Sequence, residues 1–253
     1  MWLESRVVVV VPAWDEAPRI ARVVAGLPPW VDSVIVVDDA SGDGTPDAAR
    51  GIGDPRVEVV AHADNRGVGA SIVTGYRRAS ASPGGPRDAF VVMAGDGQMD
   101  PRDLPAVVDP VARGQADYVK GDRFAGLPGN GAMPIARRIG GAVFSRATSV
   151  AIGVRISDSQ CGYTALSRAA CAQLDLEGLW PRYGYPNDLL SQVTLRGLSV
   201  AQVPVRAVYG DEVSRLRARH VPMIAAVVAR AWFRRVRSRA RGEGATPRGS
   251  PLP

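Results

Sequence analysis

The chain has 253 residues, of which 46% are hydrophobic and 22% are charged, and its formal net charge at pH 7 is +6. This length and composition are typical of an ordinary globular protein with one sizeable α/β domain and its own core. Arginine supplies almost all of the positive charge, because Lys120 is the only lysine. That charge is concentrated at the C-terminus without any nucleic-acid-binding motif, which excludes nucleic acid as an expected partner.

Strands and helices are predicted to alternate through the first half of the chain. The β-branched run "RVVVVV" at 6–11 is typical of a strand buried on both faces of a parallel sheet. The stretch 16–27 follows with apolar residues at helical spacing. Further strands are predicted at 34–37, 56–64, 88–96 and 116–124, and further helices at 65–79 and 103–114. This alternation predicts right-handed βαβ units and an open, mostly parallel, Rossmann-like α/β sheet flanked by helices.

The second half is less regular. A helix is predicted at 135–153, although Gly140 and Gly141 weaken it. The stretch 157–171 predicts a loop, a short strand at Cys161–Leu166 and the start of a helix. A helix at 185–197 and an edge strand that ends at Pro204 follow. The residues 242–253 are rich in Gly and Pro and are predicted to form a disordered tail.

Polar and acidic side chains follow the predicted strands where each strand ends. In an open α/β sheet, ligands bind beyond the carboxyl ends of the strands, so these side chains are expected to surround one crevice. One acidic strand end is a routine turn or helix cap, but four in series favour a polar ligand such as a nucleotide that carries a sugar. The residues are Trp14, Asp15 and Glu16, then Asp38 and Asp39, then Asp64 and Asn65, and finally Asp96.

Several of these segments, in this order, resemble the family 2 glycosyltransferases with a GT-A fold, especially the polyprenyl-phosphate and dolichol-phosphate sugar transferases. The similar segments are "VVVVPAWDEA", "VIVVDDASGDGT", "NRGVGASIVTGYRRA", "FVVMAGDGQMDP", "SDSQCGY" and "YGYPNDLL". The resemblance covers about residues 6 to 215. It implies a GT-A domain over 1–215. The residue pattern that follows predicts an amphipathic basic helix at 216–241.

The resemblance also implies a site for a nucleotide-diphosphate sugar. Trp14 and Glu16 would hold the base, and Asp38 or Asp39 would bond the base or its ribose. The metal-loop segment places Asp96 where the family has the second acid of its D-x-D motif, whereas Ala94 replaces the first acid. Further residues expected around the donor are Pro12, Asn65, Gly69 and Gly95.

A divalent metal, Mg²⁺ or Mn²⁺, is expected on Asp96 and Gln98. Mg²⁺ often uses only one or two protein carboxylates and takes its other ligands from phosphate and water, so the metal can survive the loss of an acid at Ala94. What Ala94 weakens is a contact to sugar or ribose. Asp100 is instead expected to cap the helix that starts with Pro101.

The acceptor side offers a base and several cations. Asp188 matches the family's base position, with Asn187 in place of the usual neighbouring acid, and Arg123 matches an arginine near the acceptor. A lipid phosphate needs no base, because a phosphate monoester with a second pKa of about 6 is largely dianionic at neutral pH. Arg137 and Arg138, with Arg146 further along, would guide such a phosphate, or they would lie on a solvated helix face.

Three polar residues before the short strand, Asp158, Ser159 and Gln160, have two possible roles. They would face the donor sugar, or they would cap and brace the strand. Cys161 is not expected to act as a nucleophile, since His62 and His220 lie far from it in sequence. The same two histidines do not have the spacing of metal ligands.

The C-terminal helix has an apolar face and a basic face. Arg230, Arg234, Arg237 and Arg241 share the basic face, and the apolar one carries Val221, Ile224, Ala225, Val228, Trp232 and Val236. Such a helix can lie in the headgroup region of an anionic membrane, or it can pack on its own domain. The resemblance favours the membrane.

The expected location is the cytoplasm, with peripheral attachment to the inner face of the cell membrane. Two cysteines without metal or redox spacing favour a reducing compartment, and the N-terminus has no signal-peptide pattern. No apolar run approaches the ~20 residues that a membrane-spanning helix needs. The oligomeric state is not indicated.

Three functions remain open on the sequence. The first is an inverting, metal-dependent transfer of a sugar from a nucleotide-diphosphate donor to polyprenyl phosphate. The second is the same chemistry on a hydroxyl acceptor, for which Asp188 would be the base. The third is a catalytically silent nucleotide-sugar-binding protein, which the substitutions at Ala94 and Asn187 suggest.

Overall fold

A computed structural model describes residues 1–125, 135–206, 208 and 220–242, without the side chains of 135–137. Within these residues, one sheet has seven strands in the order β3-β2-β1-β4-β6-β5-β7. The strands are β1 Val7–Ala13, β2 Ser33–Asp38, β3 Val57–Ala61, β4 Ala89–Val92, β5 Tyr118–Asp122, β6 Thr164–Ser167 and β7 Val200–Pro204. Only the pairs that involve β6 are antiparallel in this sheet. The predicted open, mostly parallel α/β sheet is therefore confirmed.

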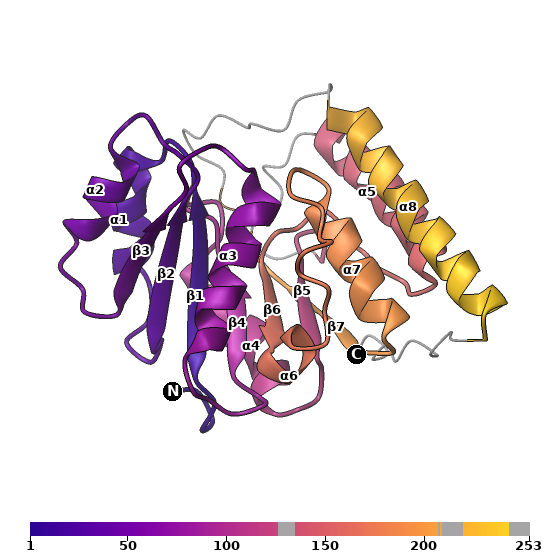
Figure 1. Cartoon of the computed structure of the whole chain (residues 1–253), viewed down its shortest axis with the longest axis horizontal. Helices are drawn as coiled ribbons and strands as arrows, with labels where there is room; N and C mark the ends of the chain where they lie inside the picture. Colours follow the sequence, from indigo (N-terminus) through magenta and orange to yellow (C-terminus); the bar gives the residue numbers. More distant parts are fainter. Residues whose placement is uncertain (126–134, 207, 209–219, 243–253) are drawn as a thin grey trace.

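Helices cover both faces of the sheet (Figure 1). One face carries α1 Ala17–Ala25, α2 Thr45–Arg50 and α4 Leu104–Ala112, which follows a short 3-10 turn at Pro101–Asp103. The other carries α3 Val68–Ala81, α6 Arg168–Cys171 and α7 Tyr185–Leu195. The sheet is thus the central layer of three, as expected for βαβ connections.

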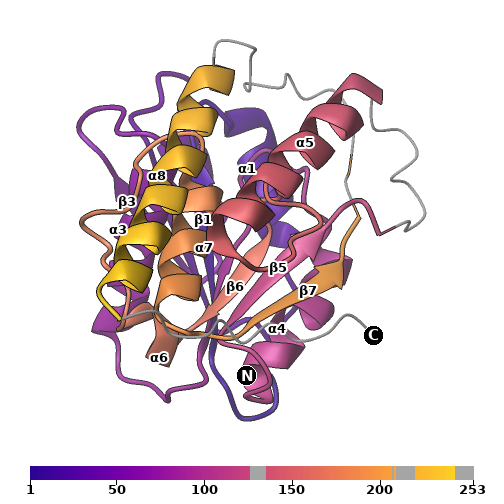
Figure 2. The ribbon, with the colours of Figure 1, turned by 90° about the vertical axis from the view of Figure 1, so that its right-hand side faces the viewer.

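Two further helices, α5 Ile135–Ile152 and α8 Val221–Ala240, lie side by side outside this arrangement. Figure 2 shows them as the outermost elements on the side of β6, β5 and β7, with α7 between α8 and the sheet. No helix in the described part of the chain is both long and apolar enough to cross a membrane.

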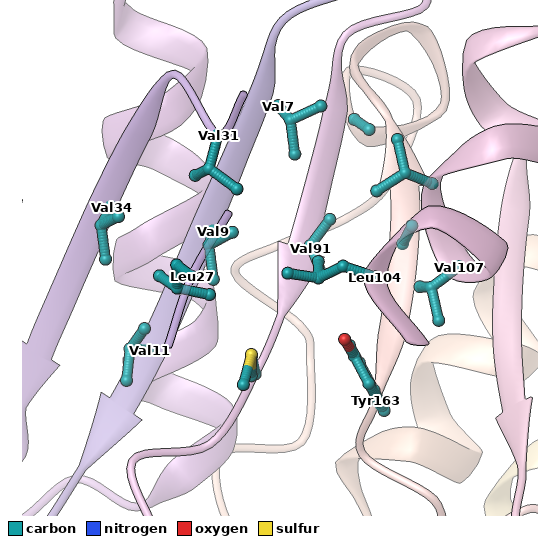
Figure 3. Close-up of a cluster of buried hydrophobic side chains, with 14 of the residues drawn as sticks. Val7, Val9, Val11, Leu27, Val31, Val34, Val91, Leu104, Val107 and Tyr163 are labelled. Atoms are coloured by element: carbon teal, nitrogen blue, oxygen red, sulfur yellow. The ribbon is translucent and has the colours of Figure 1, made fainter. Parts of the chain in front are cut away.

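The core follows from the alternation of side chains along the central strands. Val7, Val9 and Val11 face α1 and α4, whereas Val8 and Val10 face α3 and α7. Figure 3 shows the first of these clusters, in which β1 and β4 meet Leu104 and Val107 of α4. All seven residues of β1 are buried, as its continuous apolar sequence predicts.

The structure corrects some predicted boundaries. The short strand β6 lies at Thr164–Ser167, three residues later than the predicted start at Cys161. Helix α2 was not predicted, because "DGTPDAAR" is short and lacks a long apolar period. The edge strand β7 does end at Pro204, whose missing N–H suits an edge position. The predicted tail at 242–253 lies outside the described residues except for its first residue.

Helix α8 turns a different face to the protein than its pattern predicted. Ile224, which was predicted on the apolar face, is buried together with Val227 and Ala231. Arg230 and Arg234, assigned to the solvated basic side, point at the domain and contact the carboxylate of Asp188. The burial of Ile224 agrees with the alternative that the apolar face packs on the domain, whereas the predicted solvated basic face is wrong for Arg230 and Arg234.

Candidate active site

The loops after β1, β2 and β4 are joined at the carboxyl edge of the sheet. The N–H of Gly95 donates to the carbonyl of Pro12 at 3.0 Å, and the N–H of Asp39 donates to the carbonyl of Ala13 at 2.9 Å. Trp14 follows β1 with 42% of its surface exposed. Glu16 is buried beside it and accepts a 2.8 Å hydrogen bond from Arg19. The predicted strand-end residues therefore gather at one edge.

Asp38 carries an unusual carboxylate at the end of β2. The residue is only 2% exposed, and its Oδ2 accepts a hydrogen bond from the N–H of Ser41 at 3.2 Å. Its Oδ1 is buried without a hydrogen-bond partner among the described residues. Buried acceptors are nearly always paired, so this oxygen is suited to receive an N–H or O–H from a ligand.

Asp39, by contrast, holds the protein itself together. Its Oδ2 accepts from the N–H of Gly67 at 2.7 Å, and its Oδ1 accepts from the N–H of Arg66 at 2.9 Å. The ring Nδ1 of His62 lies 2.8 Å from the same Oδ1. The carboxylate thus fixes the turn that starts α3.

Two predicted donor residues, Asn65 and Gly69, lie where this turn meets the loop before α7. Asn65 donates from Nδ2 to the carbonyl of Asp39 at 3.2 Å. A Cβ on Gly69 would lie 2.2 Å from the carbonyl oxygen of Trp180, so no side chain fits there. The N–H of Ala70 donates to the carbonyl of Pro181 at 3.1 Å. Gly69 therefore allows a close contact of two backbones.

The predicted metal loop follows β4. Its two predicted metal ligands, Asp96 and Gln98, are half-buried. Asp96 accepts at Oδ1 from the N–H of Gln98 at 3.0 Å. The N–H of Ala94 donates to Sδ of Met99 at 3.3 Å. Asp100 caps the next turn by accepting from the N–H of Arg102, which confirms its predicted role.

The chemistry of these groups fits a hard divalent cation. A carboxylate and a side-chain amide oxygen are ligands that suit Mg²⁺ and Mn²⁺. The described residues contain no group of three or more His, Cys, Asp or Glu that could hold a metal. A metal at Asp96 and Gln98 would therefore take its remaining ligands from a bound diphosphate and water.

A pocket lies next to Gln98. Two arginines line it, Arg123 after β5 and Arg206 after β7, and its lining has no carboxylate among the described residues. The other lining residues are Met99, Cys161, Gly162, Tyr163 and Val205. Arg206 was not predicted, although its place just beyond the carboxyl end of β7 is the signal that could have identified it.

Both pocket arginines are positioned by buried acids. Arg123 binds Asp158 through two nitrogens, Nε to Oδ2 at 2.7 Å and Nη2 to Oδ1 at 3.0 Å. Arg206 forms an ion pair with Asp103 through its guanidinium, and the backbone N–H of Arg206 donates to the same carboxylate at 2.5 Å. The contact through two guanidinium nitrogens fixes the plane of the Arg123 side chain. Arg206 contacts its acid through one guanidinium nitrogen, Nη1, and through the backbone.

Asp158 braces this region, which is one of the two roles that the sequence predicted for it. It is fully buried, and its Oδ1 also accepts from the N–H groups of Gln160 and Cys161. Burial opposes the ionisation of Asp158, but the hydrogen bonds and charge of Arg123 outweigh it and lower the pKa of this carboxyl.

The groups around Asp158 are also buried. Lys120 donates to the carbonyl of Cys161, and burial lowers the pKa of its ammonium to about 8. Burial raises the pKa of the Cys161 thiol, which agrees with the expectation that it is not a nucleophile.

Asp188 lies apart from the pocket lining, inside the contact between α7 and α8. Its side chain is fully buried. Oδ1 accepts from Nη1 of Arg234 at 2.6 Å, and Oδ2 accepts from the N–H of Trp180 at 2.9 Å. Nε of Arg230 lies 4.0 Å from Oδ1. The carboxylate predicted as a base is thus occupied by two cations and a backbone N–H.

The predicted acceptor arginines lie on α5. Arg138 and Arg146 are exposed, and the side chain of Arg137 lies outside the described residues. Neither Arg138 nor Arg146 lines the pocket that holds Arg123 and Arg206. Asn187 is buried on α7, where its Oδ1 accepts from Thr148 of α5 at 3.0 Å.

Comparison with known proteins gives a consistent set of matches. The model of the family "Glycosyl transferase family 2" matches residues 8–174. The UDP-N-acetylglucosamine–dolichyl-phosphate N-acetylglucosaminyltransferase of Methanococcus voltae is 27% identical over 82% of this chain and 88% of its own. The undecaprenyl-phosphate mannosyltransferase of Micrococcus luteus is 29% identical over 79% of this chain and 82% of its own.

Solved structures share the fold. Glucosyl-3-phosphoglycerate synthase from Mycobacterium tuberculosis, in complex with Mn²⁺, UDP-glucose and phosphoglyceric acid, superposes with a TM-score of 0.68 at 22% identity. The match covers 91% of this chain and 82% of that one. Mannosyl-3-phosphoglycerate synthase from Rubrobacter xylanophilus superposes with a TM-score of 0.65 at 19% identity over 99% of this chain and 79% of that one. These structures support the predicted GT-A architecture.

Proposed function

The chain belongs to glycosyl transferase family 2, and from this membership we propose that it moves a sugar from a nucleotide-diphosphate donor to a polyprenyl phosphate, with inversion at the anomeric carbon. A polyprenyl phosphate is a membrane lipid, and we propose that the reaction takes place at the cytoplasmic face of the membrane. Relatives whose names include dolichyl phosphate and undecaprenyl phosphate support this acceptor.

The proposed donor site is the carboxyl edge of β1, β2 and β4. Trp14 and Glu16 would hold the base there. The backbone hydrogen bond between Gly95 and Pro12 would keep the loops after β4 and β1 together beside it. The buried Oδ1 of Asp38 would accept from a base N–H or a ribose hydroxyl, which would give this oxygen a partner. The turn before α3 would be fixed by Asp39, Asn65 and Gly69. In this role the carboxylate of Asp39 binds the turn and does not contact the donor.

Asp96 and Gln98 would hold the divalent metal against the donor diphosphate. The metal would offset the negative charge that develops on the departing nucleoside diphosphate without any proton transfer. The residues around it would orient the donor: Asp96 is itself oriented by the N–H of Gln98, and Gln98 also borders the pocket with the two arginines.

The arginine pocket carries the proposal for the acceptor. The pocket is lined by Gln98 and by the guanidiniums of Arg123 and Arg206, which have further N–H groups beyond those that bind Asp158 and Asp103. Such N–H groups suit an anion. A phosphate there needs no general base, since it is largely dianionic at neutral pH. Asp188, the predicted base for a hydroxyl acceptor, is instead bound to Arg234 and to Trp180. Arg123 and Arg206 would therefore receive the acceptor phosphate.

Transfer assays with labelled nucleotide sugars test the function. We expect label to enter an organic-extractable, mild-acid-labile product when a short polyprenyl phosphate is supplied with Mg²⁺ or Mn²⁺. Chelation with EDTA should abolish the product. Transfer to phosphoglycerate instead, or to a hydroxyl acceptor, would contradict the lipid acceptor, and donor binding without any transfer would indicate a silent binding protein.

Restoring the missing acid tests the interpretation of Ala94. In the Ala94→Asp variant we expect the KM for the donor to fall about fivefold, since a new hydrogen bond to ribose or sugar contributes about 1 kcal/mol. The kcat should change less, because the leaving-group metal already has Asp96. Ala94→Asn is the matched control for the negative charge, and an unchanged KM in both variants would contradict the lost sugar contact.

A further inference from the structure

The outer face of α5 and α8 exposes large apolar side chains on two neighbouring helices. On α5, Ile139, Val143 and Val150 are 61%, 63% and 64% exposed. Their spacing of four and seven residues places them on one stripe of the helix. On α8, Trp232, Phe233 and Val236 are 45%, 58% and 44% exposed. We call these six residues the outer apolar face.

The inner side of α8 is fixed to the domain, which sets the direction of this face. Arg234 and Arg230 bind inward at Asp188. Arg235 donates to the carbonyl of Val150 at 2.8 Å, which joins α8 to α5. Figure 2 shows the two helices side by side as the outermost elements on this side. The outer apolar face is thus a preformed surface of the folded domain.

The charge around the outer apolar face has one sign. Neither 135–152 nor 221–240 contains an aspartate or a glutamate. Arg138 and Arg146 on α5 are exposed, as are Arg237 and Arg239 on α8. Apolar and aromatic side chains with arginines beside them suit the headgroup region of an anionic bilayer.

We propose that the outer apolar face of α5 and α8 is the surface by which this protein binds anionic membranes, with both helices lying in the headgroup region. Two copies of the chain that met through this face would bring exposed arginines together without opposing carboxylates from these helices, so charge favours the lipid. The inference rests on the proposed function, because a polyprenyl phosphate acceptor is itself held in a membrane. It assigns to α5 an equal part in a contact that the sequence pattern assigned to α8 alone.

The position of the two helices agrees with this role. Both begin on the side of the carboxyl edge of the sheet, where the donor and acceptor residues gather, and run in the same direction away from it (Figure 1). A bilayer in contact with their outer face would therefore lie beside the candidate active site.

Flotation of the full chain with lipid vesicles tests the surface. We expect wild type to bind vesicles of phosphatidylcholine with phosphatidylglycerol, and to bind vesicles of phosphatidylcholine alone much more weakly. The double variants Ile139→Ser/Val143→Ser and Trp232→Ser/Phe233→Ser should each weaken binding at least about tenfold. Leu3→Ser is the matched control, since Leu3 is 49% exposed but lies at the N-terminus. Thermal melting should be unchanged in every variant, because the substituted side chains are exposed.

The outcomes separate the surface from the function. If both double variants bind vesicles like wild type, or if wild type instead forms dimers that these variants dissociate, the membrane surface is wrong. Transfer to a short, water-soluble polyprenyl phosphate does not need the membrane, so it reports on the proposed function alone. Loss of vesicle binding in the variants with that transfer intact would support the surface.

Discussion

Asp96→Ala is expected to lower the turnover of sugar transfer about 10²–10³-fold, the range found when one group that stabilises developing charge is removed from an active site. Asp96 is the only carboxylate between Phe90 and Met99, because Ala94 has replaced the first acid of the motif. The other carboxylate of this segment, Asp100, already binds the N–H and the guanidinium of Arg102, so we do not expect it to take over the metal. Initial rates at saturating donor, measured over a range of Mn²⁺ concentrations, give the effect.

Removing an exposed carboxylate outside the candidate active site is the control for the Asp96→Ala variant. Asp47 on α2 is exposed and forms an ion pair with Arg50, so Asp47→Ala should leave the rate unchanged. Asp96 is half-buried, and we expect its replacement to change the melting temperature little. If Asp96→Ala transfers sugar at the rate of Asp47→Ala, the proposed metal site is wrong.

Arg234→Met is expected to lower the free energy of unfolding by about 2–3 kcal/mol. The substitution leaves the fully buried carboxylate of Asp188 without its nearest cation. Breaking a buried ion pair by removing one partner typically costs 3–5 kcal/mol. The lower value is expected here because Arg234 is 29% exposed and Arg230 stays within 4.0 Å. Urea denaturation monitored by circular dichroism measures the change.

Replacing the other partner of this ion pair, Asp188, should lower the free energy of unfolding less. In Asp188→Asn, the amide oxygen can still accept from the N–H of Trp180, and Arg234 can be hydrated at its exposed side. The double variant should be more stable than the sum of the two single changes predicts, because the pair is lost only once. Arg237→Met, on an exposed arginine of the same helix, is the control. Additive effects in the double variant would mean that Asp188 and Arg234 do not stabilise each other.

The contacts of Asp188 also indicate its role in the candidate active site. The loop that Asp188 holds through Trp180 continues to Pro181, which accepts a hydrogen bond from the start of α3. We therefore propose that Asp188 is a positioning residue, which links α8 to the loop beside the donor side of the site. A general base would instead need hydrogen-bond reach to an acceptor hydroxyl.

The sequence predicted most of the fold because the signals for strands and helices are local. The strand Val7–Ala13 and residues 34–37 of β2 are continuous apolar runs, and such runs form strands buried on both faces. The gathering of Trp14, Asp38 and Asp96 at one edge also follows from the sequence, because parallel strands end together. Helix α2 and the start of β6 were missed, since short elements have too few residues to show a period.

What the sequence by itself determined is thus the order of the elements, the edge where polar residues meet, and the family resemblance that residues 8–174 confirm. The tertiary structure alone decided which charged side chains far apart in the sequence become partners. Asp188 and Arg234 are 46 residues apart, and Arg123 and Asp158 are 35 apart. Periodicity along one helix carries no information on such pairs. For α8, periodicity could not decide which side packs on the domain, because apolar residues occur on both sides of the helix. The packed side includes Arg230 and Arg234, because they bind the buried carboxylate of Asp188.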